Sequence, residues 1–69
     1  MSIHENLRRI REERGIPESE AAEAIGISLR SYKNLEKGER RLRIGELITL
    51  TKFLDTSADD ILGTKIGKK

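Results

Sequence analysis

Glycines at positions 15, 26, 38 and 63 divide most of this 69-residue chain into short segments. Within the segments, apolar residues recur at intervals of three and four, a spacing typical of the buried stripe of a helix. Helices frequently end at a glycine that follows their last apolar residue. No segment alternates apolar and polar residues as a half-buried strand does. The sequence therefore predicts an all-α chain of short helices.

Serines mark the starts of three of these helices. Ser2 precedes Glu5 at the spacing of a capping box, and Ser28 and Ser57 are good N-caps. The first helix, which ends at Gly15, has a predicted inner stripe of Ile3, Leu7 and Ile10.

Two further helices, the second and the fourth, follow from proline placement and apolar spacing. Pro17 suits the first turn of a second helix over about residues 17–25, and a third covers about 29–37. The fourth carries the longest apolar pattern, which consists of Ile44, Leu47, Ile48, Leu50 and Leu54. We therefore predict one five-helix domain at residues 1–63 and a basic, flexible tail at 64–69.

Composition excludes several function classes. Without cysteine, the chain has no disulfide and no cysteine-ligated zinc, so its stability depends on a small core. The single histidine, His4, is expected to be an exposed residue of a first helical turn, which is a poor place for a catalytic base. Near-matches to a calcium loop at 55–66 and to a phosphate loop at 63–68 lack obligatory residues. We predict no enzymatic activity, metal, cofactor or small-molecule ligand.

The chain has no apolar run of about 18 residues and no apolar secretion signal at its N-terminus. Together with the lack of cysteine, this leads us to expect a cytoplasmic protein with no membrane partner.

Charge is unevenly distributed. The net charge is only +2, yet residues 27–43 carry +4 between two stretches of −3, at 16–26 and 44–63. A basic block of this kind favours one face suited to a polyanion.

The spacing of Ala22, Gly26, Tyr32 and Leu35 indicates a helix-turn-helix. Ala22 is small enough to let a second helix approach, and Gly26 permits the tight turn. Tyr32 and Leu35 then anchor the helix at 29–37 on one side, so that its other side is free to enter a groove about 12 Å wide, as the major groove of DNA is.

From Leu7 to Gly63 the chain resembles the Cro/repressor (XRE-type) helix-turn-helix proteins. The stretches that match are LRRIREERGI at 7–16, AAEAIGIS at 21–28, SYKNLEKG at 31–38 and SADDILG at 57–63. The resemblance implies a five-helix, lambda-repressor-like fold. It also implies a DNA-binding regulator, usually a repressor, which binds near-palindromic double-stranded operator DNA as a homodimer.

The resemblance also implies roles for individual residues. Base contacts fall on Leu29, Arg30, Lys33 and Asn34. The chemistry agrees for Arg30, which can pair with guanine, and for Asn34, which can pair with adenine. Contacts to the DNA backbone fall on Glu18, Ser31, Arg40, Arg41 and Arg43. Arg11 and Glu36 match a pair that forms an internal salt bridge between the first and third helices.

The chain departs from the family pattern at the start of the second helix. Pro17 and Glu18 replace the usual Ser/Thr-Gln pair, and Glu18 brings negative charge to the place of a phosphate. Ala21 stands where a larger leucine is usual. These departures support an alternative function, a helix-turn-helix scaffold that binds protein and not DNA. Phe53 fits either the core or a dimer patch.

Overall fold

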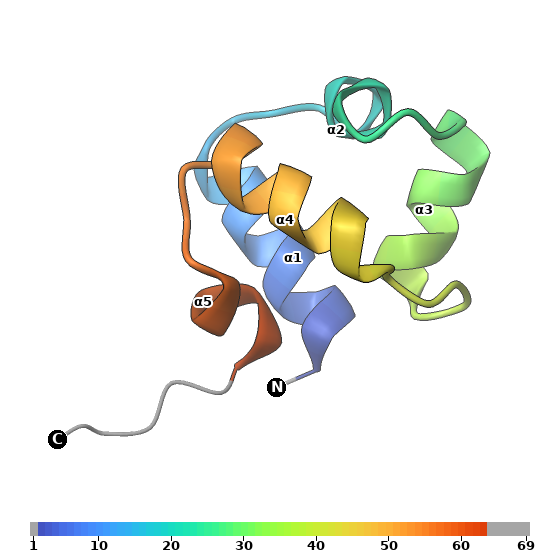
Figure 1. Cartoon of the computed structure of the whole chain (residues 1–69). Coiled ribbons are helices and arrows are strands. Elements are labelled where there is room, and N and C mark those ends of the chain that lie inside the picture. The colour runs from blue at the N-terminus through green and yellow to red at the C-terminus, as the bar shows by residue number, and fades with distance from the viewer. Residues whose placement is uncertain (1, 64–69) are drawn as a thin grey trace, which may run out of the picture.

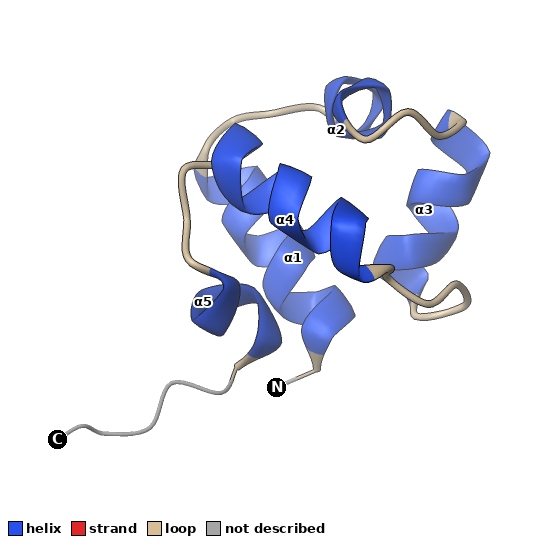
Figure 2. Cartoon of the chain, in the orientation of Figure 1, coloured by secondary structure: helices blue, strands red, loops and turns tan. Residues whose placement is uncertain are grey.

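The structure is a computed structural model that describes residues 2–63 and folds them into five helices (Figure 1). Their bounds are Ile3–Glu13 for α1, Glu18–Ala24 for α2, Leu29–Lys37 for α3, Ile44–Phe53 for α4 and Ala58–Leu62 for α5. Loops alone connect these helices, and no strand occurs within residues 2–63 (Figure 2). The predicted all-α, five-helix fold is confirmed. The predicted tail, 64–69, lies outside the described residues.

Local capping sets the helix starts. The hydroxyl oxygens of Ser2, Ser28 and Ser57 each accept a hydrogen bond from the backbone N–H three residues later, at 3.4, 3.1 and 3.1 Å. These contacts satisfy N–H groups that have no partner inside the helix. The placement of Pro17 in the first turn of α2 was wrong by one position, because Pro17 keeps an extended backbone and α2 begins at Glu18.

The helices enclose one small core. α1 packs against α3 and α5, α2 packs against α3 and α4, and α4 also packs against α5. In Figure 1, α3 lies at one edge of the molecule and α5 at the opposite side. The buried apolar residues come from all five helices and the residue that follows α4: Leu7, Ile10, Ala21, Ala22, Tyr32, Leu35, Leu47, Leu50, Leu54 and Ile61.

The apolar pattern of α4 is only partly buried. Leu47, Leu50 and Leu54 face the core as expected, but Ile44 is 75% exposed and Ile48 is 51% exposed. At 100° per residue, Ile44 and Ile48 lie beside the leucine stripe and not within it. Phe53 is also exposed, so it does not belong to the core. The apolar spacing along α4 therefore does not by itself place Ile44 and Ile48 in the core.

Two residues at the start of α1 also differ from expectation. Ile3 is exposed and does not join the buried stripe of α1. His4 is only half-exposed, because its ring lies against the backbone of Gly38 at the end of α3. A Cβ atom at Gly38 would lie 2.9 Å from the His4 ring, and Gly38 also has a φ of +82°. Both features favour glycine at this position.

Candidate nucleic-acid interface

The centre of the candidate interface is the unit formed by α2, the following turn and α3. Gly26, two residues after the end of α2, adopts a φ of +73°, which lets the chain reverse towards Ser28 and α3. The buried side chains of Ala22, Tyr32 and Leu35 then lie in the shared core. Ala21, which stands in place of a larger leucine, is fully enclosed. The observed geometry is that of the predicted helix-turn-helix.

The outer side of α3 carries polar and basic side chains. Tyr32, Leu35 and Glu36 face inward and are buried. Residues on the other side remain accessible: Leu29, Arg30, Lys33 and Lys37 are exposed, and Ser31 and Asn34 are half-buried. The residues predicted to contact bases therefore share one accessible side of one helix.

The three arginines between α3 and α4 differ in their surroundings. Arg41 and Arg43 are exposed. Arg40 instead directs its guanidinium to Glu46 in α4, and two hydrogen bonds of 2.8 Å join them. These hydrogen bonds lower the pKa of Glu46 and raise the pKa of Arg40. Of the three arginines predicted to contact phosphates, two are therefore accessible and one is already paired.

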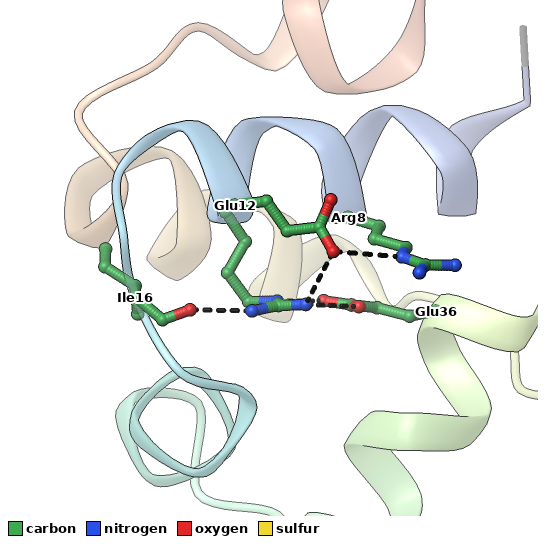
Figure 3. A network of polar contacts seen from close by, with 5 residues as sticks. Arg8, Glu12, Ile16 and Glu36 are labelled. Atoms are coloured by element: carbon green, nitrogen blue, oxygen red, sulfur yellow. Dashed lines mark hydrogen bonds and ion pairs between the residues drawn. The ribbon is translucent and has the colours of Figure 1, made fainter.

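A buried ion pair fixes α3 to α1 (Figure 3). Arg11 donates from Nε and Nη2 to the two carboxylate oxygens of Glu36, at 2.6 and 3.1 Å, and from Nη1 to the carbonyl oxygen of Ile16 at 2.7 Å. The hydrogen bond to Glu36 raises the pKa of Arg11. Glu12 bridges this pair to Arg8 at the surface. The Arg11–Glu36 pair implied by the family resemblance is therefore present.

Tyr32 lies beside this ion pair. Its side chain is fully buried, and its hydroxyl has no hydrogen-bond partner within residues 2–63. Burial, and secondarily the nearby Glu36 carboxylate, raises the pKa of Tyr32, so the phenol stays neutral. Tyr32 therefore has a packing role between α3 and the rest of the core.

Glu18 borders a charged groove of about 380 Å³ next to the outer side of α3. The groove is lined by side chains from α1, α2 and α3, namely Arg8, Arg11, Glu12, Glu18, Lys33, Glu36 and Lys37. Glu18 thus lies near Lys33, one of the predicted base-contact residues. Its negative charge reduces the positive potential at this edge of the interface.

Sequence reasoning missed two residues of this region. Lys37 lies four residues after Lys33 and borders the same groove, so helical spacing pointed to it. Glu46 lies three residues after Arg43 and accepts its backbone N–H at 3.0 Å. The Arg40–Glu46 pairing has no comparable signal in the sequence, because it depends on the path of the connecting loop.

Comparison with known proteins agrees with this geometry. A family model described as helix-turn-helix matches residues 7–61. The chain belongs to this family, in its XRE-type form.

Two similar solved structures are known regulators. A transcriptional regulator from Listeria innocua is 26% identical, with a TM-score of 0.83 over 99% of this chain. The P22 c2 repressor, solved in complex with a synthetic operator, is 23% identical, with a TM-score of 0.82 over 94% of this chain and 98% of that one. The chain spans 63% of the length of the Listeria regulator.

No curated protein sequence matches the chain. Within the described residues, none of the helices has the length and apolar character needed to span a membrane.

Proposed function

We propose that this chain is a sequence-specific, double-stranded DNA-binding transcriptional regulator that acts as a repressor, with α3 in the major groove. The observation that carries the proposal is the accessible side of α3, which presents Arg30, Lys33 and Asn34 together. The opposite side of this helix is held to α1 by the Arg11–Glu36 pair. A repressor of this kind occupies a promoter and thereby excludes other proteins from it. The similarity to regulators of known structure supports the same conclusion.

Each side chain on α3 suits a particular base contact. Arg30 can donate two hydrogen bonds to O6 and N7 of guanine, and Asn34 can form two hydrogen bonds with N6 and N7 of adenine. Leu29 offers an apolar contact to a thymine methyl group, and Lys33 reaches either a base or a phosphate. These contacts read sequence, whereas those of Ser31, Arg41 and Arg43 to the DNA backbone set position.

The proposal includes a homodimer on a near-palindromic operator. One α3 helix contacts only a few base pairs, so two copies related by a twofold axis are needed to read a full site. The two α3 helices would then lie about 34 Å apart, which is one turn of DNA.

A salt titration tests the proposed function. Binding of the protein to duplex DNA, selected from a random pool, is measured at increasing salt by fluorescence anisotropy. The logarithm of the association constant is expected to fall linearly with the logarithm of the salt concentration, with a slope of about −0.9 for each phosphate contact. No binding to any duplex at low salt would contradict the proposal and favour the protein-binding scaffold, which Pro17 and Glu18 support.

Glu18 provides a second prediction. Replacing Glu18 by glutamine is expected to tighten DNA binding by about fivefold, because the change removes a negative charge from the groove beside Lys33. Glu20→Gln is the matched control, since Glu20 is also in the first turn of α2 but is not part of that groove. Equal affinities of the Glu18 variant and the unsubstituted protein would show that Glu18 lies away from the DNA backbone.

A further inference from the structure

The connector between α3 and α4, residues 38–43, is held to a helix at each of its ends. At the α3 end, the backbone N–H of Arg40 donates to the carbonyl oxygen of Asn34 at 3.2 Å. At the α4 end, the Arg40 guanidinium makes its two hydrogen bonds with Glu46. Arg40 therefore spans the gap from the last turn of one helix to the first turn of the next.

Glu46 also binds a second residue of the same connector, Arg43. Its Oε1 atom accepts both from Arg40 Nη1 at 2.8 Å and from the backbone N–H of Arg43 at 3.0 Å. The side chains of Arg40 and Glu46 are only 23% and 11% exposed, so water competes weakly for these contacts. Between the two fixed residues, Leu42 packs against the core and Arg41 is exposed.

This attachment links two helices that share α2 as a neighbour but otherwise pack against different helices. α3 packs against α1 and α2, whereas α4 packs against α2 and α5. The position of Arg41 and Arg43 relative to α3 thus depends on the connector. If the connector moved freely, both arginines would have to be ordered when DNA binds, and that ordering weakens binding.

We propose that Glu46 is a positioning residue for DNA binding: with Arg40 it forms a strut that presents Arg41 and Arg43 to the DNA backbone, while Arg40 itself contacts no phosphate. This inference rests on the proposed function and replaces the sequence-based assignment of Arg40 to a phosphate. The strut fixes the position of Arg41 and Arg43 relative to the base-contact residues of α3.

Replacing Glu46 by glutamine tests the strut, because the loss of negative charge and the loss of the strut are expected to change the affinity for DNA in opposite directions. On charge alone, removal of an anion near DNA tightens binding. A glutamine has one acceptor oxygen where glutamate has two, so it cannot form the two parallel hydrogen bonds with the Arg40 guanidinium, and the strut predicts roughly tenfold weaker binding. Binding is measured by anisotropy on the selected duplex, at a temperature where circular dichroism shows each variant folded.

Glu39→Gln is the matched control for this experiment. Glu39 lies in the same connector and is exposed, so the variant makes the same change in charge without touching the strut. We expect Glu39→Gln to tighten binding slightly while Glu46→Gln weakens it. Tighter or unchanged binding by Glu46→Gln, in line with the Glu39 variant, would overturn the inference.

A second variant covers the case in which Glu46→Gln fails to fold. Arg40→Lys keeps the positive charge, which suffices for a phosphate contact, but a lysine cannot form the two parallel hydrogen bonds. The strut predicts several-fold weaker binding by folded Arg40→Lys, and binding equal to that of the unsubstituted protein would refute it. If the unsubstituted protein itself does not bind DNA, the proposed function fails, and this inference fails with it.

Discussion

Replacing Glu36 by alanine is expected to lower the free energy of unfolding by about 3–5 kcal/mol, because the buried Arg11 guanidinium loses its main counter-ion and both hydrogen bonds to it, and keeps only the longer contact with the exposed Glu12. The two side chains are only 10% and 4% exposed, so water cannot take the place of the missing carboxylate. Small domains have a total stability of roughly 5 kcal/mol or a little more. We therefore expect a largely unfolded variant, measured by urea denaturation followed by circular dichroism.

The Arg8–Glu12 pair gives a matched control for the Glu36 variant. It joins the same types of side chain at 3.3 Å, but the two are 64% and 54% exposed. Arg8→Ala is therefore expected to cost less than about 0.5 kcal/mol. A loss of similar size in both variants would contradict the view that burial sets the cost of the Arg11–Glu36 pair.

A double variant separates the charge from the packing. Arg11→Met combined with Glu36→Leu removes both charges and keeps most of the volume between α1 and α3. It is expected to regain most of the stability lost by Glu36→Ala, because no unpaired charge remains. If the double variant is no more stable than the single one, the pair contributes through its hydrogen bonds, including the one to the carbonyl oxygen of Ile16.

Features that depend on neighbouring residues along the chain were predictable from the sequence. Ser2, Ser28 and Ser57 begin helices because each hydroxyl reaches a backbone N–H only three residues away. The accessible side of α3 was predictable for a similar reason. Tyr32 and Leu35 lie three apart, and burying them turns the opposite side of a regular helix outward.

Features that depend on how the helices pack or on the path of a loop were not predictable from local sequence patterns. Ile44 and Ile48 have the apolar character of core residues, but which side of a mostly apolar helix is covered depends on where its neighbours pack. Similarly, Arg40 and Arg41 are adjacent and chemically identical, and only the path of the loop brings one of them to Glu46. The contact between His4 and Gly38 also joins residues far apart in the sequence.

Arg30→Ala is expected to weaken binding to the preferred duplex by about 1–3 kcal/mol, or roughly fivefold to 150-fold, and to relax discrimination at one base pair. Arg30 is exposed on α3, and within the described residues no hydrogen bond or ion pair holds its side chain, so the fold is expected to be unchanged. The measurement compares affinities for the selected duplex with those for duplexes that carry single base changes.

Arg41→Ala is the informative partner of the Arg30 variant, because it removes the same charge from another exposed position. A phosphate contact carries no direct sequence information, so Arg41→Ala is expected to weaken all duplexes alike and to make the salt slope shallower by about one. Arg30→Ala is expected instead to change the ranking of duplexes. If the two variants lose affinity equally for every duplex, α3 does not read bases through Arg30, and the side chain acts only as another positive charge near the DNA backbone.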